Sequence, residues 1–241
     1  MAALVVIPAR GGSKGLPDKN LAKIKDETLV AWAIAAIPPK VPCILSSDSE
    51  AILDLAVYPH VSPMHRGKGH AEDWSHDLQT AQEIINPDLS GIVLQPDDFL
   101  VWLRPTSPFR EPPDVAAIIE YMDAHPEIDS LRSVVPAKEH PAKMYRISGD
   151  LGDGIDWLAP WDGPHRANHP RQLLPPAFRA CGWIDAIRVR CIRDHSMEGF
   201  VIGAWRPPYP DVRALEIDDE DDLVLAKETA HKRVWRPGKC S

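Results

Sequence analysis

The sequence predicts an α/β fold in which a largely parallel sheet is covered by helices. Short apolar, β-rich runs bounded by Gly, Pro or Asp alternate with stretches in which apolar residues recur at spacings of three and four. Such alternation is typical of parallel strands joined by crossover helices. With 241 residues, 44% of them hydrophobic, the chain is long enough to bury one full core.

Each element follows from its own pattern. Strands buried on both faces are expected where the apolar runs are continuous, at 4–9, 42–47, 99–105, 130–136 and 183–192. Helices are expected between them, at 28–37, 49–57, 71–85 and 114–125.

A stretch rich in Gly, Asp, Trp and Pro interrupts this alternation after residue 149. We therefore expect one domain over 1–235 with a small excursion at about 149–182, followed by a frayed tail at 236–241.

Composition excludes several classes of protein. A net charge of −8 argues against nucleic-acid binding, and no apolar segment has the length of a membrane span. Met1 leads into the first strand without a charged leader, so we expect a cytoplasmic protein. The four cysteines form no C-x-x-C pair, which argues against a disulfide framework or structural zinc, and no histidine has a metal-ligand spacing with them.

The loop after the first strand, in ALVVIPARGGSKGLPDKN, carries Arg10, Lys14 and Lys19 among three glycines. It follows the carboxyl end of a parallel strand, where α/β proteins bind ligands, and glycines let backbone N–H groups approach a phosphate. The loop lacks the patterns of a P-loop and of a dinucleotide fold. Clustered cations repel one another unless an anion lies among them, which favours a polyphosphate site over a solvated basic loop.

At these residues the chain resembles the cytidylyltransferases that make CMP-activated acidic sugars, the CMP-sialic acid synthetases and their relatives. The likeness continues in order through SSDSEAI, HRGKGHAEDWSHD, LRPTSPFR, SVVPAKEHPAKMY, RQLLPP and EIDDEDDL. The resemblance implies transfer of CMP from CTP to an acidic acceptor with release of pyrophosphate. It also implies a three-layer Rossmann-like nucleotidyltransferase sandwich with a mixed, largely parallel sheet and a small dimerisation excursion.

The nucleotide site is expected in the first loop. Arg10, Lys14 and Lys19 would neutralise the triphosphate and stabilise the leaving pyrophosphate, so they are the predicted catalytic residues. By the family pattern Asn20 reads the base, and Arg66 corresponds to a nucleotide-contacting arginine, although Gly67 stands where proline usually follows. The complete predicted CTP-binding set is Pro8, Ala9, Arg10, Gly11, Gly12, Ser13, Lys14, Lys19, Asn20 and Arg66.

The acidic run EIDDEDDL predicts a metal site. A solvated helix start explains Asp219 to Asp222, because acidic residues favour a first turn. Glu216 and Asp218 flank Ile217 in an expected strand end and would project to one face, where two carboxylates suit Mg²⁺ shared with phosphates. The family has Asp at position 216, and helix capping stays open as an alternative.

The acceptor site departs from that of the sialic acid synthetases. Arg104 stands where those enzymes commonly have Gln, and C181-G182-W183-I184-D185 stands where they have N-G-x-x-Y. With Lys143 and Arg171 at acceptor-side family positions, we expect a compact cationic pocket for a small dianion such as phosphonoformate. A sialic or other 3-deoxy-ulosonic acid remains the alternative. Asp73 and Asp77 would orient the acceptor, hold a second ion or cap a helix.

The expected partners are CTP, Mg²⁺, the acceptor and a second copy of the chain. Trp157, Trp161 and Trp183 in the excursion are costly to leave in water, which favours a homodimer. Two other classes stay open. A sugar-nucleotide transferase would usually carry a D-x-D motif, and only PDD is present at 96–98. A non-catalytic nucleotide-binding module would have no need of the acceptor-side residues.

Overall fold

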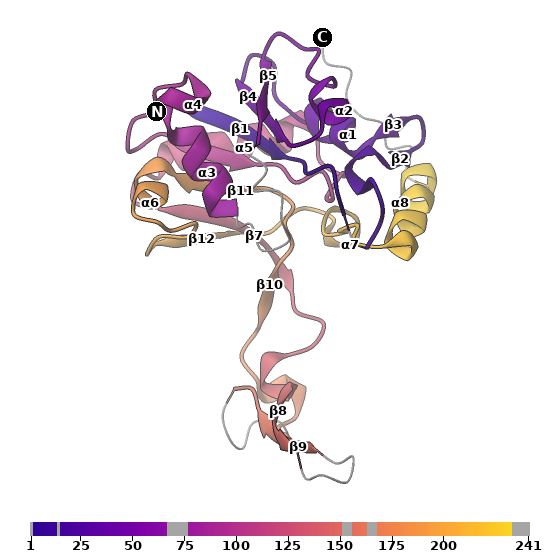
Figure 1. Cartoon of the computed structure of the whole chain (residues 1–241). Coiled ribbons are helices and arrows are strands. Elements are labelled where there is room, and N and C mark those ends of the chain that lie inside the picture. The colour runs from indigo at the N-terminus through magenta and orange to yellow at the C-terminus, as the bar shows by residue number, and fades with distance from the viewer. Residues whose placement is uncertain (1, 14, 67–76, 151–155, 163–167, 233–241) are drawn as a thin grey trace. The chain divides into compact units, whose positions relative to one another are not determined.

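The structure is a computed structural model that describes residues 2–13, 15–66, 77–150, 156–162 and 168–232 (Figure 1). The chain divides into two compact units. The larger unit comprises the residues up to Ser133 and those from Cys181 onward, and the smaller unit runs from Val134 to Ala180. Each unit is described by itself.

The strands, in chain order, are β1 Ala3–Pro8, β2 Lys23–Ile24, β3 Glu27–Thr28, β4 Cys43–Ser47, β5 Val61–His65, β6 Phe99–Trp102, β7 Ser130–Pro136, β8 Tyr145–Asp150, β9 Asp156–Pro160, β10 Phe178–Ala180, β11 Asp185–Arg188 and β12 Ile202–Trp205. The α-helices are α1 Leu29–Ala35, α2 Glu50–Leu53, α3 Asp77–Ile85, α4 Pro87–Ser90, α5 Pro112–Ala124, α6 Val189–Arg193, α7 Pro210–Arg213 and α8 Glu220–Lys232. Short 3-10 helices are η1 Lys19–Leu21, η3 Pro141–Lys143 and η4 Arg171–Leu173.

The main sheet confirms the predicted fold class. Its strand order is β10-β7-β11-β6-β1-β4-β5, and β12 pairs with β7. The pairs β1/β4, β1/β6, β4/β5 and β7/β12 are parallel, whereas β11 runs antiparallel to both β6 and β7. The sheet is therefore mixed and largely parallel, as expected.

Helices cover both faces of the sheet (Figure 1). On one face, alternate strand residues such as Leu100 and Ile187 form a core with residues of α3 and α6. The opposite alternate positions, Val5 and Ile7 among them, are also fully buried, and α1 contacts β1. Because side chains alternate across a strand, continuous apolar runs such as LVVI are what a sheet covered on both faces requires.

Two sequence predictions of secondary structure are wrong. The expected strand at 183–192 ends at Arg188, and α6 follows at once, because the N–H groups of Val189 and Arg190 donate to the carbonyls of Asp98 and Pro96 at 2.9 Å. The expected strand end at Glu216–Asp218 is irregular backbone, fixed by a hydrogen bond from the Ile217 N–H to the Thr106 carbonyl at 2.9 Å.

The smaller unit contains the antiparallel hairpin β8–β9 and the pairing of β10 with the end of β7. The predicted excursion, 149–182, overlaps most of this unit. Several large apolar side chains of the hairpin region are exposed, among them Ile147, Trp157, Leu158 and Trp161 at 59–67%. Trp183 was expected in the excursion together with Trp157 and Trp161. It belongs instead to the larger unit and is fully buried.

Among the described residues, no helix combines the length and the apolar character that crossing a membrane requires.

Candidate active site

Functional side chains follow the carboxyl ends of four parallel strands at one edge of the sheet. Arg10 follows β1, Asp48 follows β4, Arg66 follows β5 and Arg104 follows β6. The carboxyl edge of a parallel sheet is where α/β proteins bind their ligands, since loops there converge without strands in the way. The topology thus brings together residues that lie far apart in the sequence.

The loop after β1 is fastened to the loop after β4. The Gly11 N–H donates to Asp48 Oδ1 at 2.7 Å, and the Ala9 N–H donates to the Ser46 carbonyl at 2.9 Å. Within the loop, the buried Asn20 donates from Nδ2 to the Arg10 carbonyl at 2.8 Å. These bonds fix residues 9–11 of the predicted phosphate loop to β4, to Asp48 and to Asn20.

Two glycines of this loop have different surroundings. A Cβ on Gly15 would lie 2.5 Å from the Asp218 carbonyl oxygen, so Gly15 lets the loop approach the acidic segment closely. A Cβ on Gly12 would meet no described atom within 4 Å. Packing of the described chain therefore explains Gly15, whereas the space beside Gly12 is open to a ligand.

Arg66 is a buried guanidinium with weak partners. It is 7% exposed, and its hydrogen bonds to described residues, from Nε to Ser46 Oγ and from Nη2 to the Ser46 carbonyl, are both 3.5 Å long. Among the described residues, no carboxylate lies within ion-pair distance of it. Burial lowers the pKa of Arg66, with Asp48 opposing that shift and Arg10 adding to it. A buried cation of this kind is stabilised by an anion that enters the site.

The predicted metal ligands differ in exposure and contacts. Asp218 is exposed, and its Oδ1 forms an ion pair with Lys19 Nζ at 3.0 Å. Glu216 is partly buried, and its Oε1 would lie 3.4 Å from a Cβ on Gly182. Among the described residues there is no group of three or more His, Cys, Asp or Glu side chains placed to hold a metal. Two carboxylates with oxygen ligands suit Mg²⁺ only if phosphate oxygens and water complete the shell.

The rest of the acidic run caps helix α8. Asp219 Oδ1 accepts from the Asp222 N–H at 3.0 Å, and Asp222 Oδ2 accepts from the N–H groups of Asp218 and Asp219 at 3.0 and 3.4 Å. This reciprocal pair is a capping box. The interpretation of Asp219–Asp222 as a helix start is therefore confirmed, and it leaves the side chains of Glu216 and Asp218 outside the cap.

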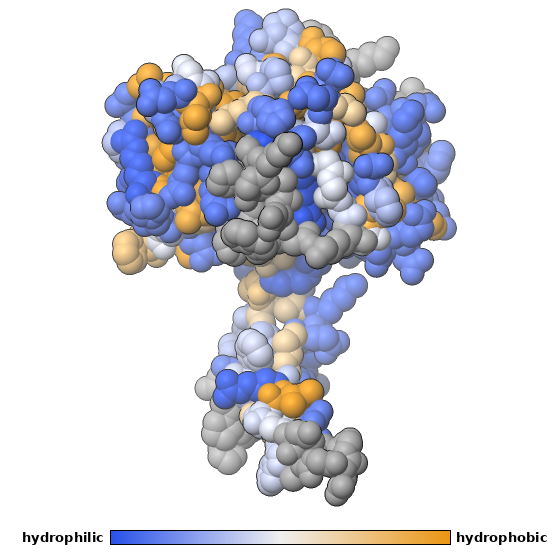
Figure 2. Space-filling model, in the orientation of Figure 1, coloured by the Kyte–Doolittle hydropathy of each residue, from blue (hydrophilic) through white to orange (hydrophobic). Residues whose placement is uncertain are grey.

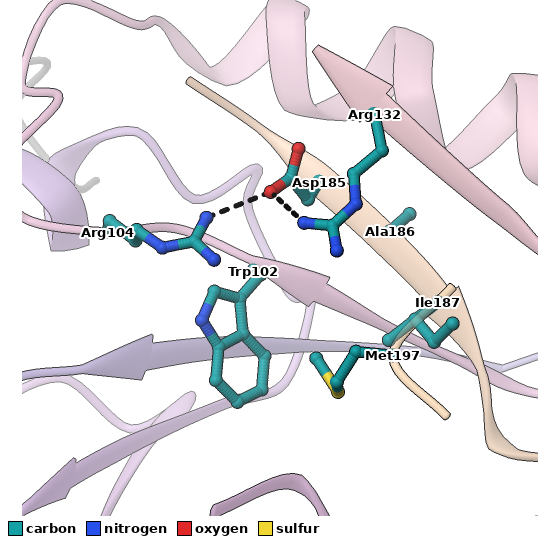
Figure 3. A pocket seen from close by; sticks show the side chains of 7 residues that line it. All are labelled: Trp102, Arg104, Arg132, Asp185, Ala186, Ile187 and Met197. Atoms are coloured by element: carbon teal, nitrogen blue, oxygen red, sulfur yellow. Dashed lines mark hydrogen bonds and ion pairs between the residues drawn. The ribbon is translucent and has the colours of Figure 1, made fainter. Parts of the chain in front are cut away.

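Arg104 is engaged by carboxylates. Its Nη2 lies 2.6 Å from Asp77 Oδ2, and its Nη1 lies 2.9 Å from Asp185 Oδ2, which also pairs with Arg132 at 3.0 Å (Figure 3). Burial opposes the charge of Arg104, but Asp77 and Asp185 outweigh it and raise its pKa. The extra charge at position 104 is thus balanced within the protein, which weakens its predicted role as the anchor of a dianion.

A second buried arginine supports this segment. Arg110 is 3% exposed and donates to the carbonyls of Trp183 and Arg104, and burial lowers its pKa to about 9, helped by the charge of Arg104. It therefore ties the loop after β6 to the turn at Gly182, which has a φ of 59°. A Cβ on Gly182 would lie within 4 Å of Glu216, Ser107 and Arg104, so these three side chains converge at the turn.

The remaining predicted residues lie elsewhere. Lys143 and Arg171 belong to the smaller unit, where Lys143 Nζ donates to the His169 carbonyl at 2.9 Å and Arg171 donates to the carbonyls of Ala137 and Lys138. Lys14 and Asp73 lie outside the described residues.

Sequence reasoning missed Asp48, Arg110 and Arg132. Asp48 stands inside the SSDSEAI motif, so its position after a strand could have identified it. Arg132 sits within β7 and gave no local signal.

Comparison with known proteins agrees with this geometry. The sequence model of the cytidylyltransferase family matches residues 4–146. The N-acylneuraminate cytidylyltransferase of Streptococcus agalactiae serotype V is 29% identical over 230 residues, which cover 93% of this chain and 52% of the relative. The CMP-N,N'-diacetyllegionaminic acid synthase of Legionella pneumophila is 36% identical over 124 residues, covering 50% of this chain and 53% of that protein. The chain thus spans about half the length of these curated relatives.

Among solved structures, the CMP:2-keto-3-deoxy-manno-octonic acid synthetase complexed with CTP aligns with a TM-score of 0.66 and 15% identity, over 97% of this chain and 100% of that one. At this identity the likeness establishes the fold alone.

Proposed function

The chain belongs to the cytidylyltransferase family, and from that premise we propose that it transfers CMP from CTP to a small acidic acceptor with release of pyrophosphate. The acceptor we favour is a sialic acid or another 3-deoxy-ulosonic acid, because the similar proteins are named for such acids. We expect the reaction to take place in the cytoplasm.

The observation that carries the proposal is the unsatisfied cation at the carboxyl edge of the sheet. Arg66 is buried there without a carboxylate partner among the described residues, beside a fastened loop that carries Arg10 and Lys19. CTP brings about four negative charges, and cations held in place before binding stabilise charge that builds on a leaving pyrophosphate. The open space beside Gly12 admits a phosphate close to backbone N–H groups.

Asn20 is the residue proposed to read the base. One amide hydrogen is used by the Arg10 carbonyl, which fixes the orientation of the side chain. The other amide hydrogen and the carbonyl oxygen offer a donor and an acceptor, which suits the edge of cytosine better than a charged group does.

The chemical step of the transfer needs few side chains of the protein. A hydroxyl oxygen of the acceptor attacks the α-phosphorus in line and gives up its proton to solvent, the bond to pyrophosphate breaks, and the positive groups of the first loop stabilise the departing anion. Glu216 and Asp218 are the residues that would hold Mg²⁺, which when bound supplies further positive charge to the phosphates. For Asp218 to do so, Lys19 would exchange its carboxylate partner for a phosphate.

A homodimer is part of the proposal. The hairpin β8–β9 and the residues after it expose Ile147, Trp157, Leu158 and Trp161 at 59–67%, and apolar atoms are visible on the surface of this unit in Figure 2. An exposed cluster of large apolar side chains is typical of an interface. Lys143 and Arg171 of this unit are proposed to meet the acid group of the acceptor.

The test is pyrophosphate release from CTP with an acceptor panel. N-acetylneuraminate and 3-deoxy-manno-octulosonate are expected to drive release that EDTA abolishes, whereas phosphonoformate, the acceptor predicted from the charge of Arg104, is expected to be poor because that charge is already paired. Replacing CTP by UTP or ATP is the control for base recognition. Binding of CTP without release with any acceptor would indicate a non-catalytic module, and robust turnover of phosphonoformate alone would restore the phosphonate assignment.

A further inference from the structure

Two short 3-10 helices of the smaller unit carry the cations that are proposed to meet the acid group of the acceptor. Lys143 ends η3, and Arg171 begins η4. The two segments are cross-linked in both directions. Lys143 Nζ donates to the His169 carbonyl, before η4, at 2.9 Å. Arg171 Nη2 donates to the carbonyls of Ala137 and Lys138, before η3, at 3.2 and 2.7 Å.

His140 adds a third cross-link between the same two segments. Its Nε2 lies 2.8 Å from the Pro175 carbonyl oxygen, and its Nδ1 lies 3.1 Å from the Ala142 backbone nitrogen. A carbonyl can only accept and a backbone N–H can only donate, so these partners require a neutral imidazole with its proton on Nε2. The Nδ1 bond caps η3 locally, whereas the Nε2 bond joins the start of η3 to the chain that follows η4.

The three cross-links differ in how they respond to an acid group. A carboxylate of the acceptor competes with backbone carbonyls for the N–H groups of Lys143 and Arg171, because a hydrogen bond between two charged groups is the stronger one. The neutral imidazole of His140 carries no charge that would draw it from Pro175 to that carboxylate. Of these three bonds, the one from His140 can therefore persist while both cations turn to the substrate.

We propose that His140 is a positioning residue of the acceptor site, which holds η3 and η4 together while Lys143 and Arg171 bind the acid group. The inference rests on the proposed function, which assigns these two cations to the acceptor. His140 acts through them rather than on the acceptor itself. Without its bond to Pro175 the two segments can separate, so the cations have to be ordered at the moment of binding and acceptor affinity falls.

The first experiment observes the imidazole without any substrate. Protein with ¹⁵N-labelled histidine is studied by NMR at about pH 8, where imidazoles are neutral. The His140 signals are identified by their absence from His140→Gln. We expect the tautomer with the proton on Nε2, as the partners Pro175 and Ala142 require. A proton on Nδ1, or exchange between the two tautomers, overturns the proposal, because Nε2 would then not hold the Pro175 carbonyl.

The second experiment separates the two bonds of His140. In His140→Gln the amide nitrogen stands near the place of Nε2 and can donate to Pro175, whereas in His140→Asn the amide oxygen stands near the place of Nδ1 and can accept only from Ala142. N-acetylneuraminate is titrated calorimetrically into protein that holds the α,β-methylene analogue of CTP, which cannot release pyrophosphate. We expect His140→Asn to weaken binding by about tenfold and His140→Gln to keep the wild-type affinity. Any result in which His140→Gln binds no better than His140→Asn overturns the proposal.

His125→Asn is the matched control. His125 is a partly exposed histidine of the larger unit whose Nδ1 lies 3.0 Å from Glu127 Oε1, and its replacement should leave acceptor affinity unchanged. With CTP itself, His140→Asn is expected to raise KM for the acceptor and to keep kcat, and an equal loss of kcat overturns the positioning role. Pyrophosphate release by the wild type decides the proposed transfer separately. Acceptor binding without release refutes the transfer and leaves the role of His140 standing, whereas a wild type that binds no acceptor overturns both.

Discussion

Two buried arginines at opposite edges of the sheet show the difference between a structural cation and one that awaits a ligand. Arg188 ends β11, which is antiparallel to β6, so it lies where β6 begins, at the amino edge of the parallel strands. It is fully buried and donates to the carbonyls of Ile128, Asp97, Met122 and His125 at 2.6–3.0 Å. Arg66, at the carboxyl edge, has hydrogen bonds of 3.5 Å to Ser46 and, within the described parts of the chain, no others.

Burial lowers the pKa of both side chains, so burial alone does not separate the two roles. The two roles differ in how well the N–H groups of the guanidinium are hydrogen-bonded within the protein. Arg188 donates from all three of its guanidinium nitrogens to carbonyls of the protein and so stabilises the fold, whereas the long, poor bonds of Arg66 leave donors for an anion.

The largest expected effect on stability is at Arg188. Arg188→Met removes the donors of four backbone carbonyls, and we expect it to lower the free energy of unfolding by roughly 3 to 5 kcal/mol. Urea unfolding followed by circular dichroism measures it. Wild-type stability in this variant would show that the bonds to these carbonyls contribute little. Arg188 would then not be a structural cation.

Arg66→Met is the matched variant at the other edge. Because the guanidinium has no carboxylate partner among the described residues, its loss should change the free energy of unfolding by less than about 1 kcal/mol. CTP affinity should fall by about 100-fold, since a buried charged donor to phosphate is lost. Calorimetric titration with CTP checks the second effect. Unchanged affinity in a folded variant would remove Arg66 from the nucleotide site.

One glycine at each edge of the sheet differs in the same way, one being packed by the protein and the other facing open space. A Cβ on Gly199, which has a φ of 71°, would lie 2.5 Å from the Asp129 Cβ, so Gly199→Ala is expected to lower the free energy of unfolding by about 2 kcal/mol. A Cβ on Gly12 would meet no atom of the described residues within 4 Å. Gly12→Ala should therefore leave thermal unfolding unchanged and reduce stabilisation by CTP. The opposite pattern, a destabilised Gly12 variant and a tolerant Gly199, would contradict both assignments.

The sequence predicts the elements whose signal is local. Continuous apolar runs identified β1, β4, β6 and β7, and the cations between glycines identified the loop that the structure fastens to Asp48. The helix α6 and the irregular backbone at Ile217 could not be read in this way. Both depend on hydrogen bonds to Asp98, Pro96 and Thr106, which lie some 90 to 110 positions earlier in the chain.

Contacts between residues far apart in the sequence also decide the candidate site, and the sequence did not show them. The charge of Arg104 was visible in the sequence, but its partners Asp77 and Asp185 lie 27 and 81 positions away. A sequence shows which charges are present, whereas the fold decides which of them are paired. The predicted dianion pocket assumed that Arg104 was available, and the structure gives it two carboxylates.

The smallest expected effect is a pH dependence at the amino edge. The Asp129 carboxylate accepts hydrogen bonds from the N–H groups of Val201 and Phe200, and with the help of Arg190 these bonds lower its pKa to about 2. Its pKa in the folded protein is thus below that of an unfolded chain, near 3.9, so its contribution to stability is full above about pH 4 and is lost as the pH falls toward 2. In Asp129→Asn the free energy of unfolding should be lower at pH 7 and should decline less steeply over this range. Urea titrations at pH 7, 4 and 2.5 measure both, and a variant that keeps the wild-type slope would show that other carboxylates cause the loss of stability in acid.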